Sequence, residues 1–436
     1  MAVSQGSAVF FGGWGVLETV LFGGIMYGWP SLVFVLKGER YFSHLCKCET
    51  NCTETNASTN AGPTSCAAQD EQFNLIFAIT GAVVCIFLVL SGTIFDRLGT
   101  FIARLLGSVV FLAGSLMIAF STPAISYVLY PAVLCVMYGG FCILVTNVQL
   151  GNLLTKGRNI MICIMNGSFD SSSFITLVVK LLYKGGVTLR VSFITISATY
   201  IICLVSTCLW LPRKIIPYPL SDDFEMKIRF LCKPAAVKKK NEKQKTLNDG
   251  KINNAFELDT NNKSVQIGAK CQNLRVSNAE MSVDDITLNK EDGYSMEPSQ
   301  LQPLKAALLS SLFWTDVLWF VSNNLRVAFF LGNFNSWITF LTKGNTQNVS
   351  LYTSVFSSIS LTSIIVSILA GAIIDRRTTA PVGSLAFKLE KLRHFIPMFY
   401  LNIGLGVLLS ACAAIPVLEL QYFTFVVFVF HRTFIY

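Results

Sequence analysis

Long apolar runs separated by short polar segments dominate the 436-residue chain. A helix needs about 20 mainly apolar residues to cross a bilayer, because each residue rises about 1.5 Å and every backbone group must be bonded internally. The pattern predicts ten membrane spans, of which the seventh is long and expected to be broken, with GNFNSW at 332–337 as its unwound part. They cover approximately residues 10–36, 73–94, 101–121, 125–150, 160–183, 191–211, 308–341, 351–374, 395–414 and 418–436.

The composition agrees with a membrane protein, since 53% of the residues are apolar and only 14% are charged. Residues 213–305 depart from this pattern. They contain the run KPAAVKKKNEKQK, are otherwise polar and Asn-rich, and show little apolar periodicity, which is typical of a disordered linker. We therefore expect an N-terminal six-helix half over 1–212, a cytoplasmic central loop over 213–305 and a C-terminal part over 306–436.

Lysine and arginine concentrate in alternate loops, which predicts that these loops and the N-terminus are cytoplasmic. The net charge of +9 reflects this topology. We expect the lipid bilayer as a partner and no nucleic acid, because no basic face with interleaved aromatic residues is free to bind one. The basic residues in question are Arg97 and Arg104, Lys156 and Arg158, those of 213–305, and Arg376, Arg377, Lys388, Lys391 and Arg393.

Four of the 13 cysteines lie in one loop that this topology places outside, where disulfides persist: Cys46, Cys48, Cys52 and Cys66. Four cysteines allow three pairings, and the sequence does not choose among them. The same loop holds glycosylation sequons at Asn51 and Asn56, and a third, at Asn348, falls in another predicted outside loop.

A short motif occurs twice, once after the second span and once after the eighth. Aligning Gly92 with Gly371 also aligns Asp96 with Asp375 and Arg97 with Arg376. Glycine lets helices approach closely, the aspartate can accept from a neighbouring helix end, and the arginines, with Arg104, can pair with carboxylates across the cytoplasmic face. We interpret these seven residues as gating residues, whose contacts form in one conformation and break in another.

The repeated motif resembles the G-x-x-x-D-R-x-G motif of the major facilitator superfamily. Further stretches resemble the solute carrier 43 family, which contains nucleobase and large neutral amino acid facilitators. These stretches are YGWPSLVFVLK (27–37), AAQDEQFNLIF (67–77), IFDRLGTFIARL (94–105), TNVQLGNLL (146–154), NGSFDSSSF (166–174), KLLYKGGVTLRVSFI (180–194), IPYPL (216–220), LQYFTF (420–425) and RTFIY (432–436).

The resemblance implies an all-α polytopic membrane protein with two six-helix halves. It also implies facilitative, sodium-independent transport of purine nucleobases, such as adenine, guanine and hypoxanthine, across the plasma membrane by alternating access. The superfamily has twelve spans and the pattern here gives ten, so we expect the second half to be truncated to about four helices.

Polar residues inside spans mark candidate transport sites, because a charge in hydrocarbon costs several kcal/mol. A carboxylate can accept from the N–H groups of a nucleobase, an amide can pair with its edge, and an aromatic ring can stack on its face. Helical spacing puts Asn166, Asp170 and Ser173 on one face of the fifth span. The candidate substrate-binding residues are Glu18, with Lys180 as its partner, Asn147, Gln149, Asn166, Asp170, Ser171, Ser173, Trp319 and Asn335.

Two other functions remain open. One is a facilitator of large neutral amino acids, whose site would have to receive a carboxylate and an ammonium group. The other is a non-transporting truncated form that acts through a full-length partner. We do not expect an enzyme, a cofactor or a metal site, because no nucleophile with its base and no metal-ligand spacing is present and the three histidines lie far apart.

Overall fold

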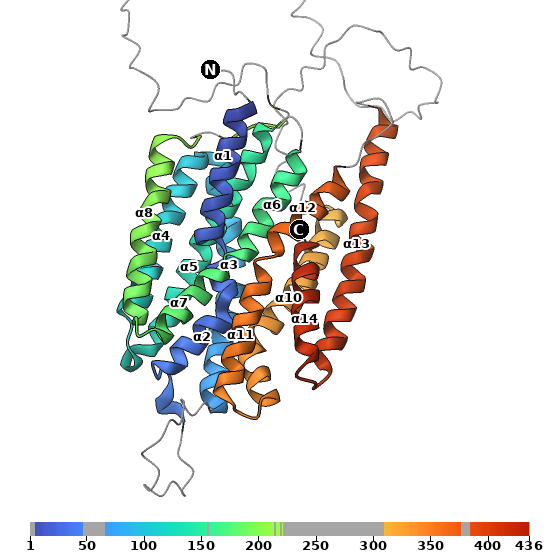
Figure 1. Ribbon diagram of the computed structural model, residues 1–436. Coiled ribbons are helices and arrows are strands. Elements are labelled where there is room, and N and C mark those ends of the chain that lie inside the picture. Colours follow the sequence, from blue (N-terminus) through green and yellow to red (C-terminus); the bar gives the residue numbers. More distant parts are fainter. Residues whose placement is uncertain are drawn as a thin grey trace, which may run out of the picture. The chain divides into compact units, whose positions relative to one another are not determined.

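Every regular element in the described part of the chain is a helix (Figure 1). The structure is a computed structural model that describes residues 5–46, 66–154, 157–212, 215–218, 220, 309–375 and 384–435. The chain divides into two compact units. One, Met1–Lys233 with Trp314–Tyr436, holds the described helices apart from the start of one, and the other, Pro234–Phe313, is described only over 309–313.

The N-terminal part contains six spans, and several of them are built from more than one helical segment. Gly99 turns the chain between the second and third spans with a φ of 84°, which glycine adopts without strain. In chain order the segments are α1 (Gln5–Glu18), the π turn η1 (Thr19–Gly23), the 3₁₀ turn η2 (Ile25–Gly28), α2 (Trp29–Gly38), η3 (Ser43–Leu45), α3 (Ala67–Leu98), α4 (Thr100–Phe120), η5 (Pro123–Val128), α5 (Leu129–Val148), η6 (Gln149–Leu153), α6 (Arg158–Ser171), α7 (Phe174–Lys184) and α8 (Leu189–Leu209).

The C-terminal part contains five helices in its described residues. Side chains fix where two of them begin: Asn345 Oδ1 accepts from the amides of Gln347 and Asn348 at 3.0 and 3.2 Å, and Ser384 Oγ accepts from Phe387 N at 3.1 Å. The helices are α10 (Ser311–Leu341), α11 (Thr346–Ser360), α12 (Ser363–Ile374), α13 (Leu385–Ala414) and α14 (Leu420–Thr433).

Eight helical stretches in the described residues are long and apolar enough to cross a membrane. Two of the ten predicted spans are not among them. These two are α10, which contains Asp316 and Arg326, and α14, whose helix has 14 residues. The predicted break in the seventh span is wrong, because α10 is continuous. Three of its four asparagines donate to carbonyls four residues back, for example Asn323 at 2.9 Å and Asn333 at 3.0 Å, so their amides are satisfied without unwinding the helix.

Glycines allow α4 and α5 to pack closely. A Cβ on Gly114 would lie 2.7 Å from Ala132 O, and a Cβ on Gly139 would lie 2.7 Å from Gly107 O. Small residues serve this purpose in membranes, where association depends on van der Waals packing because lipid tails are as apolar as leucine. The second and fourth spans are also neighbours, through α3 and α5.

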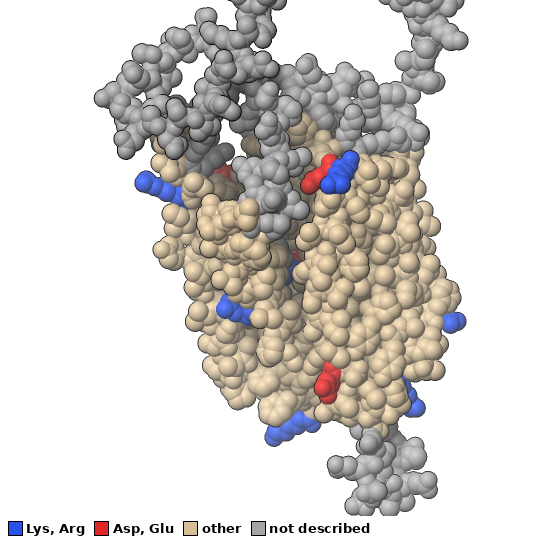
Figure 2. Space-filling model, turned by 180° about the vertical axis from the view of Figure 1, so that it is seen from behind, with Lys and Arg blue, Asp and Glu red and all other residues tan. Residues whose placement is uncertain are grey.

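The outer surface of the helical unit is largely apolar. On the face in Figure 2, Lys, Arg, Asp and Glu side chains lie mainly towards the two ends, and most of the area between them is tan. Exposed side chains on this surface include Val89 on α3, Phe329 on α10 and Val407 on α13. Such exposure suits a bilayer environment, and the chain is a multi-pass membrane protein.

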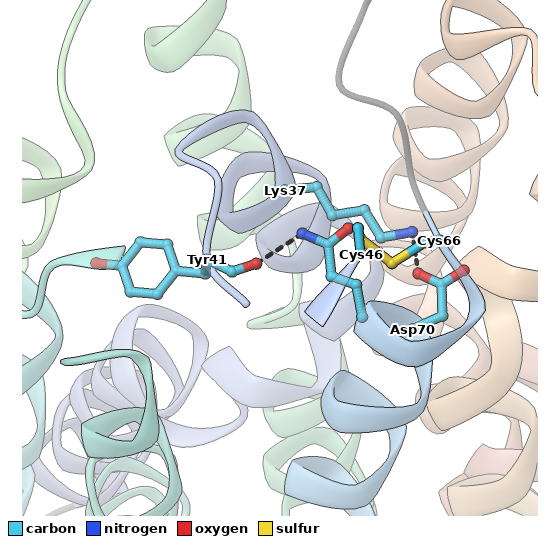
Figure 3. The surroundings of a disulfide bond; sticks show 6 residues. Lys37, Tyr41, Cys46, Cys66 and Asp70 are labelled. Atoms are coloured by element: carbon cyan, nitrogen blue, oxygen red, sulfur yellow. Dashed lines mark hydrogen bonds and ion pairs between the residues drawn. A yellow bond between two sulfur atoms is a disulfide. The ribbon is translucent and has the colours of Figure 1, made fainter. Parts of the chain in front are cut away.

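A disulfide joins Cys46 to Cys66 and ties the end of η3 to the start of α3 (Figure 3). The structure thus excludes the pairings in which Cys46 is bonded to Cys48 or Cys52. Cys48 and Cys52 themselves lie outside the described residues. An ion pair between Lys37 and Asp70 lies beside the bond. Gln69 Nε2 donates to Tyr41 O at 2.6 Å, so this end of the first two spans is held at several points.

Candidate functional site

Three interrupted spans contact one another in the middle of the helical unit. The first span is interrupted at η1 and η2, the fifth between α6 and α7, and the eighth between α11 and α12. Ser171 Oγ donates to the carbonyls of Ser360 and Leu361, both at 3.2 Å, which the interruption of the eighth span leaves free. A Cβ on Gly24 would lie 2.0 Å from Phe169 O, so the first and fifth spans approach as closely as backbones allow.

A buried ion pair lies at this meeting point and joins the two parts of the chain. Arg432 Nε on α14 donates to Asp170 Oδ1 on α6 at 2.9 Å. Arg432 is 1% exposed and Asp170 7%, so the pair is shielded from solvent. The guanidinium lies 4.1 Å from the centre of the Tyr27 ring and also donates to Asn324 Oδ1 at 3.4 Å. Four spans therefore hold one charge pair.

A small cavity of about 10 Å³ adjoins the ion pair, which is about enough for one water molecule. Asp170 and Ser173 line it, and neither Asp170 Oδ2 nor Ser173 Oγ has a hydrogen-bond partner among the described residues. A buried carboxylate oxygen without a donor is costly, so this oxygen has room to accept a further hydrogen bond. The remaining lining residues are Tyr27, Leu331, Phe356, Ser360, Ser363, Phe428, Val429 and Arg432.

The contact between the fifth and eighth spans, which we call the seam, is closed on both sides of the ion pair. We call the end of the seam at Asp375 the inner end and the end towards the disulfide the outer end, following the predicted sides of the membrane. At the inner end, Asp375 accepts from Asn159 Nδ2 at 2.6 Å and from Ile160 N at 3.4 Å. A carboxylate is favourable there because the first amides of α6 have no partner within the helix.

At the outer end, Lys180 links the two parts of the chain. Its ammonium group donates to Ser350 O at 2.5 Å, to Ser354 Oγ at 2.9 Å and to Thr353 Oγ1, all on α11. The prediction that Lys180 pairs with Glu18 is therefore wrong. Lys180 is fully buried, and its three donors are satisfied by oxygens that the start of α11 presents.

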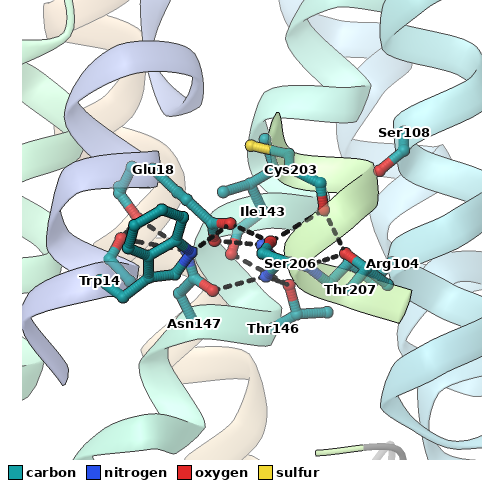
Figure 4. A network of polar contacts seen from close by, with 12 residues as sticks. Trp14, Glu18, Arg104, Ser108, Ile143, Thr146, Asn147, Cys203, Ser206 and Thr207 are labelled. Carbon is teal, nitrogen blue, oxygen red and sulfur yellow. Dashed lines mark hydrogen bonds and ion pairs between the residues drawn. The ribbon is translucent and has the colours of Figure 1, made fainter. Parts of the chain in front are cut away.

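Glu18 instead belongs to a closed network inside the N-terminal part (Figure 4). It forms a buried ion pair with Arg104 and accepts from Trp14 Nε1 at 2.9 Å and from Ser206 Oγ. Arg104 also donates to Asn147 Oδ1 at 2.5 Å. Glu18 and Asn147 thus lie with Arg104, and neither lines the cavity at Asp170. Arg104, expected at the cytoplasmic face, is buried at 2% exposure.

The other predicted binding residues are spread over several places. Gln149 bonds Thr100 and the segment after the sixth span, and Trp319 packs edge-on against Phe399 at 5.1 Å. Asn335 Nδ2 donates to Pro30 O at 3.1 Å, where α10 meets α2. Of the residues predicted on one face of the fifth span, Asp170 and Ser173 line the cavity, whereas Asn166 does not.

The two copies of the repeated motif have different surroundings. A Cβ on Gly371 would lie 2.6 Å from Ile160 Cα, so α12 packs directly on α6, and Asp375 bonds the start of α6. No atom outside its own helix lies within 4 Å of the Gly92 Cβ position, and Asp96 and Arg97 are exposed. Arg376 lies outside the described residues, as do the sequons at Asn51 and Asn56, and Asn348 is half-buried in the first turn of α11.

Sequence reasoning missed Arg432 and Tyr27. The sequence did contain one indication of Arg432, a single arginine directly after the apolar run LQYFTFVVFVFH. Charged residues within membrane spans are by default candidates for functional sites. Tyr27 had no distinguishing pattern among the many aromatic residues. Within the described ranges, no group of three His, Cys, Asp or Glu side chains could hold a metal ion.

Packed helices, interrupted spans and a buried charge pair between two parts of the chain define a membrane carrier. The model of the Major Facilitator Superfamily matches residues 67–435. The chain belongs to this superfamily and, within it, to the solute carrier 43 family.

Known relatives of two kinds resemble most of the chain. It is 31% identical over 429 residues to equilibrative nucleobase transporter 1 of Bos taurus, a match that covers 97% of this chain and 80% of the relative. It is 26% identical over 456 residues to large neutral amino acids transporter small subunit 3 of Homo sapiens, covering 96% and 78%. For the Mus musculus protein of that name the identity is 26%, covering 83% and 64%.

Proposed function

We propose that the chain carries purine nucleobases such as adenine, guanine and hypoxanthine across the plasma membrane by sodium-independent facilitation. The observation that carries the proposal is the unpartnered Asp170 Oδ2 beside Arg432, between aromatic rings at the meeting point of the interrupted spans. The 31% identity to a nucleobase transporter supports the substrate.

The chemistry of the site suits a neutral planar ligand. Asp170 accepts from a ring or exocyclic N–H, Ser173 supplies a hydroxyl that can donate or accept, and the aromatic rings of Tyr27 and Phe428 line the cavity. A neutral ligand leaves the ion pair with Arg432 in electrical balance. The other sequence candidates, including Glu18, Asn147 and Asn335, support the helices that carry these groups.

Transport requires the seam to open, because a cavity the size of one water is too small for a purine. In the proposed cycle the outer contacts of Lys180 and the inner contacts of Asp375 break alternately. The gating residues would be Gly92, Asp96, Arg97, Arg104, Gly371, Asp375 and Arg376, each making its contacts in one of the two states. Lys180 joins this set on the outer side.

The site also favours a second candidate function, the transport of large neutral amino acids. An α-carboxylate would face Arg432 and an α-ammonium group would face Asp170, and two relatives with this transporter name are 26% identical. A non-transporting role beside a full-length partner is the third candidate. In each case the chain would lie in the plasma membrane with its N-terminus cytoplasmic and Asn51, Asn56 and Asn348 glycosylated outside.

Uptake by proteoliposomes that contain the purified chain separates these functions. The nucleobase proposal predicts saturable uptake of labelled adenine, inhibition by unlabelled guanine and hypoxanthine but not by leucine, and equal rates when choline replaces sodium. Inhibition by leucine, together with uptake of labelled leucine, would establish the amino acid function. Absence of uptake of both substrates would leave the non-transporting role.

A further inference from the structure

The segment that follows the sixth span folds back against the inner end of the N-terminal part. Ile216 is 1% exposed and belongs to an apolar cluster with Phe11, Leu150 and Leu211. The sequence predicted a disordered linker from residue 213 onwards, which is wrong for Ile215–Tyr218. A buried isoleucine at the start of the linker shows that this part of it is packed against the helices.

The side chains of η6 hold the backbone of this segment at one residue. Gln149 Oε1 accepts from Ile216 N at 3.2 Å, and Asn152 Nδ2 donates to Ile216 O at 3.0 Å. Gln149 is oriented in turn by Thr100, to whose Oγ1 it donates at 2.9 Å. Both backbone groups of Ile216 are therefore satisfied, as burial requires, and the contact fixes the register of the segment.

Arg158, the first residue of α6, fastens the segment from the other side. Its Nε donates to Asn152 Oδ1 at 2.7 Å, and its guanidinium lies 4.1 Å from the centre of the Tyr218 ring. The next residue, Asn159, makes the inner contact of the seam with Asp375 at 2.6 Å. Neighbouring residues at the start of one helix thus hold the segment and the second part of the chain.

We propose that Ile215–Tyr218 is a strap that orients the first turn of α6 and so favours closure of the inner end of the seam. Arg158 is a positioning residue: it holds α6 in the orientation in which Asn159 and the amide of Ile160 reach Asp375. When the strap is released, the first turn of α6 gains freedom, the contact with Asp375 weakens, and the inner end opens more often. The inference rests on the proposed alternating access and is independent of the substrate.

Native Cys163 reports on this opening. It lies on α6 one turn beyond Asn159 and is 8% exposed, so a maleimide reaches it only when the packing around the start of α6 loosens. In the purified full chain without substrate, the rate of Cys163 modification is followed by mass spectrometry. Tyr218→Ala is expected to raise the rate roughly two- to fivefold, the factor that corresponds to loss of an exposed cation–π contact. Tyr218→Phe keeps the ring and the original rate.

Ser197→Ala is the matched control. It removes a hydrogen bond of 2.8 Å to Ser115 in the same half of the chain, between α4 and α8, and leaves the strap untouched. The proposal predicts an unchanged Cys163 rate in this variant, and an increased rate in Arg158→Lys, which loses the planar group that stacks on Tyr218. An unchanged rate in Tyr218→Ala, or an equal increase in Ser197→Ala, would overturn it. Because no substrate is present, either result is separate from failure of the nucleobase proposal.

Discussion

Replacing Asp170 by asparagine tests the buried ion pair most sharply. The substitution keeps the shape of the side chain and removes its charge, which leaves the Arg432 guanidinium buried without its carboxylate. Breaking a buried pair in this way costs about 3–5 kcal/mol of folding stability. A ligand that donates to the carboxylate would lose a charge-assisted hydrogen bond of about 1.5–3 kcal/mol, which corresponds to a fall in affinity of roughly 10- to 100-fold.

Adding Arg432→Gln to Asp170→Asn separates the two effects. The double variant replaces two charges by two neutral amides, so thermal stability in detergent should recover much of what Asp170→Asn lost. Adenine uptake should stay low, because the carboxylate that receives the N–H group is still absent. Melting temperature is measured in detergent and uptake in proteoliposomes, with the amount of protein in the membrane determined for each variant.

Recovery of adenine uptake in parallel with stability would refute this reasoning. It would show that the pair joins the two parts of the chain and that Asp170 makes no contact with the ligand. An Asp170→Asn variant with the original melting temperature would refute the burial of the pair itself.

Four further substitutions test other parts of the structure. Glu18→Gln should lower the melting temperature by breaking the pair with Arg104, but leave the KM for adenine within about twofold, since uncoupled sites behave independently; a large rise in KM would place Glu18 at the ligand. Lys180→Met should speed labelling of a cysteine placed at Ser350, which is 2% exposed and whose backbone carbonyl still accepts from Lys180, and an unchanged labelling rate would remove Lys180 from the outer gate. Gly371→Val should lower the melting temperature by separating α12 from Ile160, whereas Gly92→Val, with open space beside it, should leave the melting temperature unchanged, and an equal fall in both would contradict the close packing of α12 on α6.

The helices could be predicted from the sequence because each apolar run must satisfy its backbone within the membrane. The interruptions were harder to see. The seventh span contains many polar residues and looked broken, yet three of its four asparagines donate to carbonyls of the preceding turn and α10 stays continuous. The fifth span is interrupted beside Ser172, where the pattern NGSFDSSSF suggested a polar face but gave no sign of a break.

Glu18, Asn147 and Asp170 are buried within the spans, as expected, but their partners were not predicted. These three residues look alike in the sequence, since each is a polar residue in an apolar run. Which residue each one pairs with depends on which helices contact one another, and the local sequence pattern does not show this. Asp170 pairs with a residue 262 positions further along the chain, and Glu18 with one 86 positions further along. Likewise Gln149 looked like a ligand for a nucleobase edge and instead holds the backbone of Ile216.

Adenine counterflow measures the central claim most directly. Proteoliposomes that contain the 436-residue chain are loaded with unlabelled adenine and diluted into a trace of labelled adenine. A facilitator that exposes the Asp170 site alternately to the two sides should accumulate label transiently above its equilibrium level, and vesicles with Asp170→Asn should not. No transient accumulation with the unaltered chain, or equal accumulation with Asp170→Asn, would contradict the account.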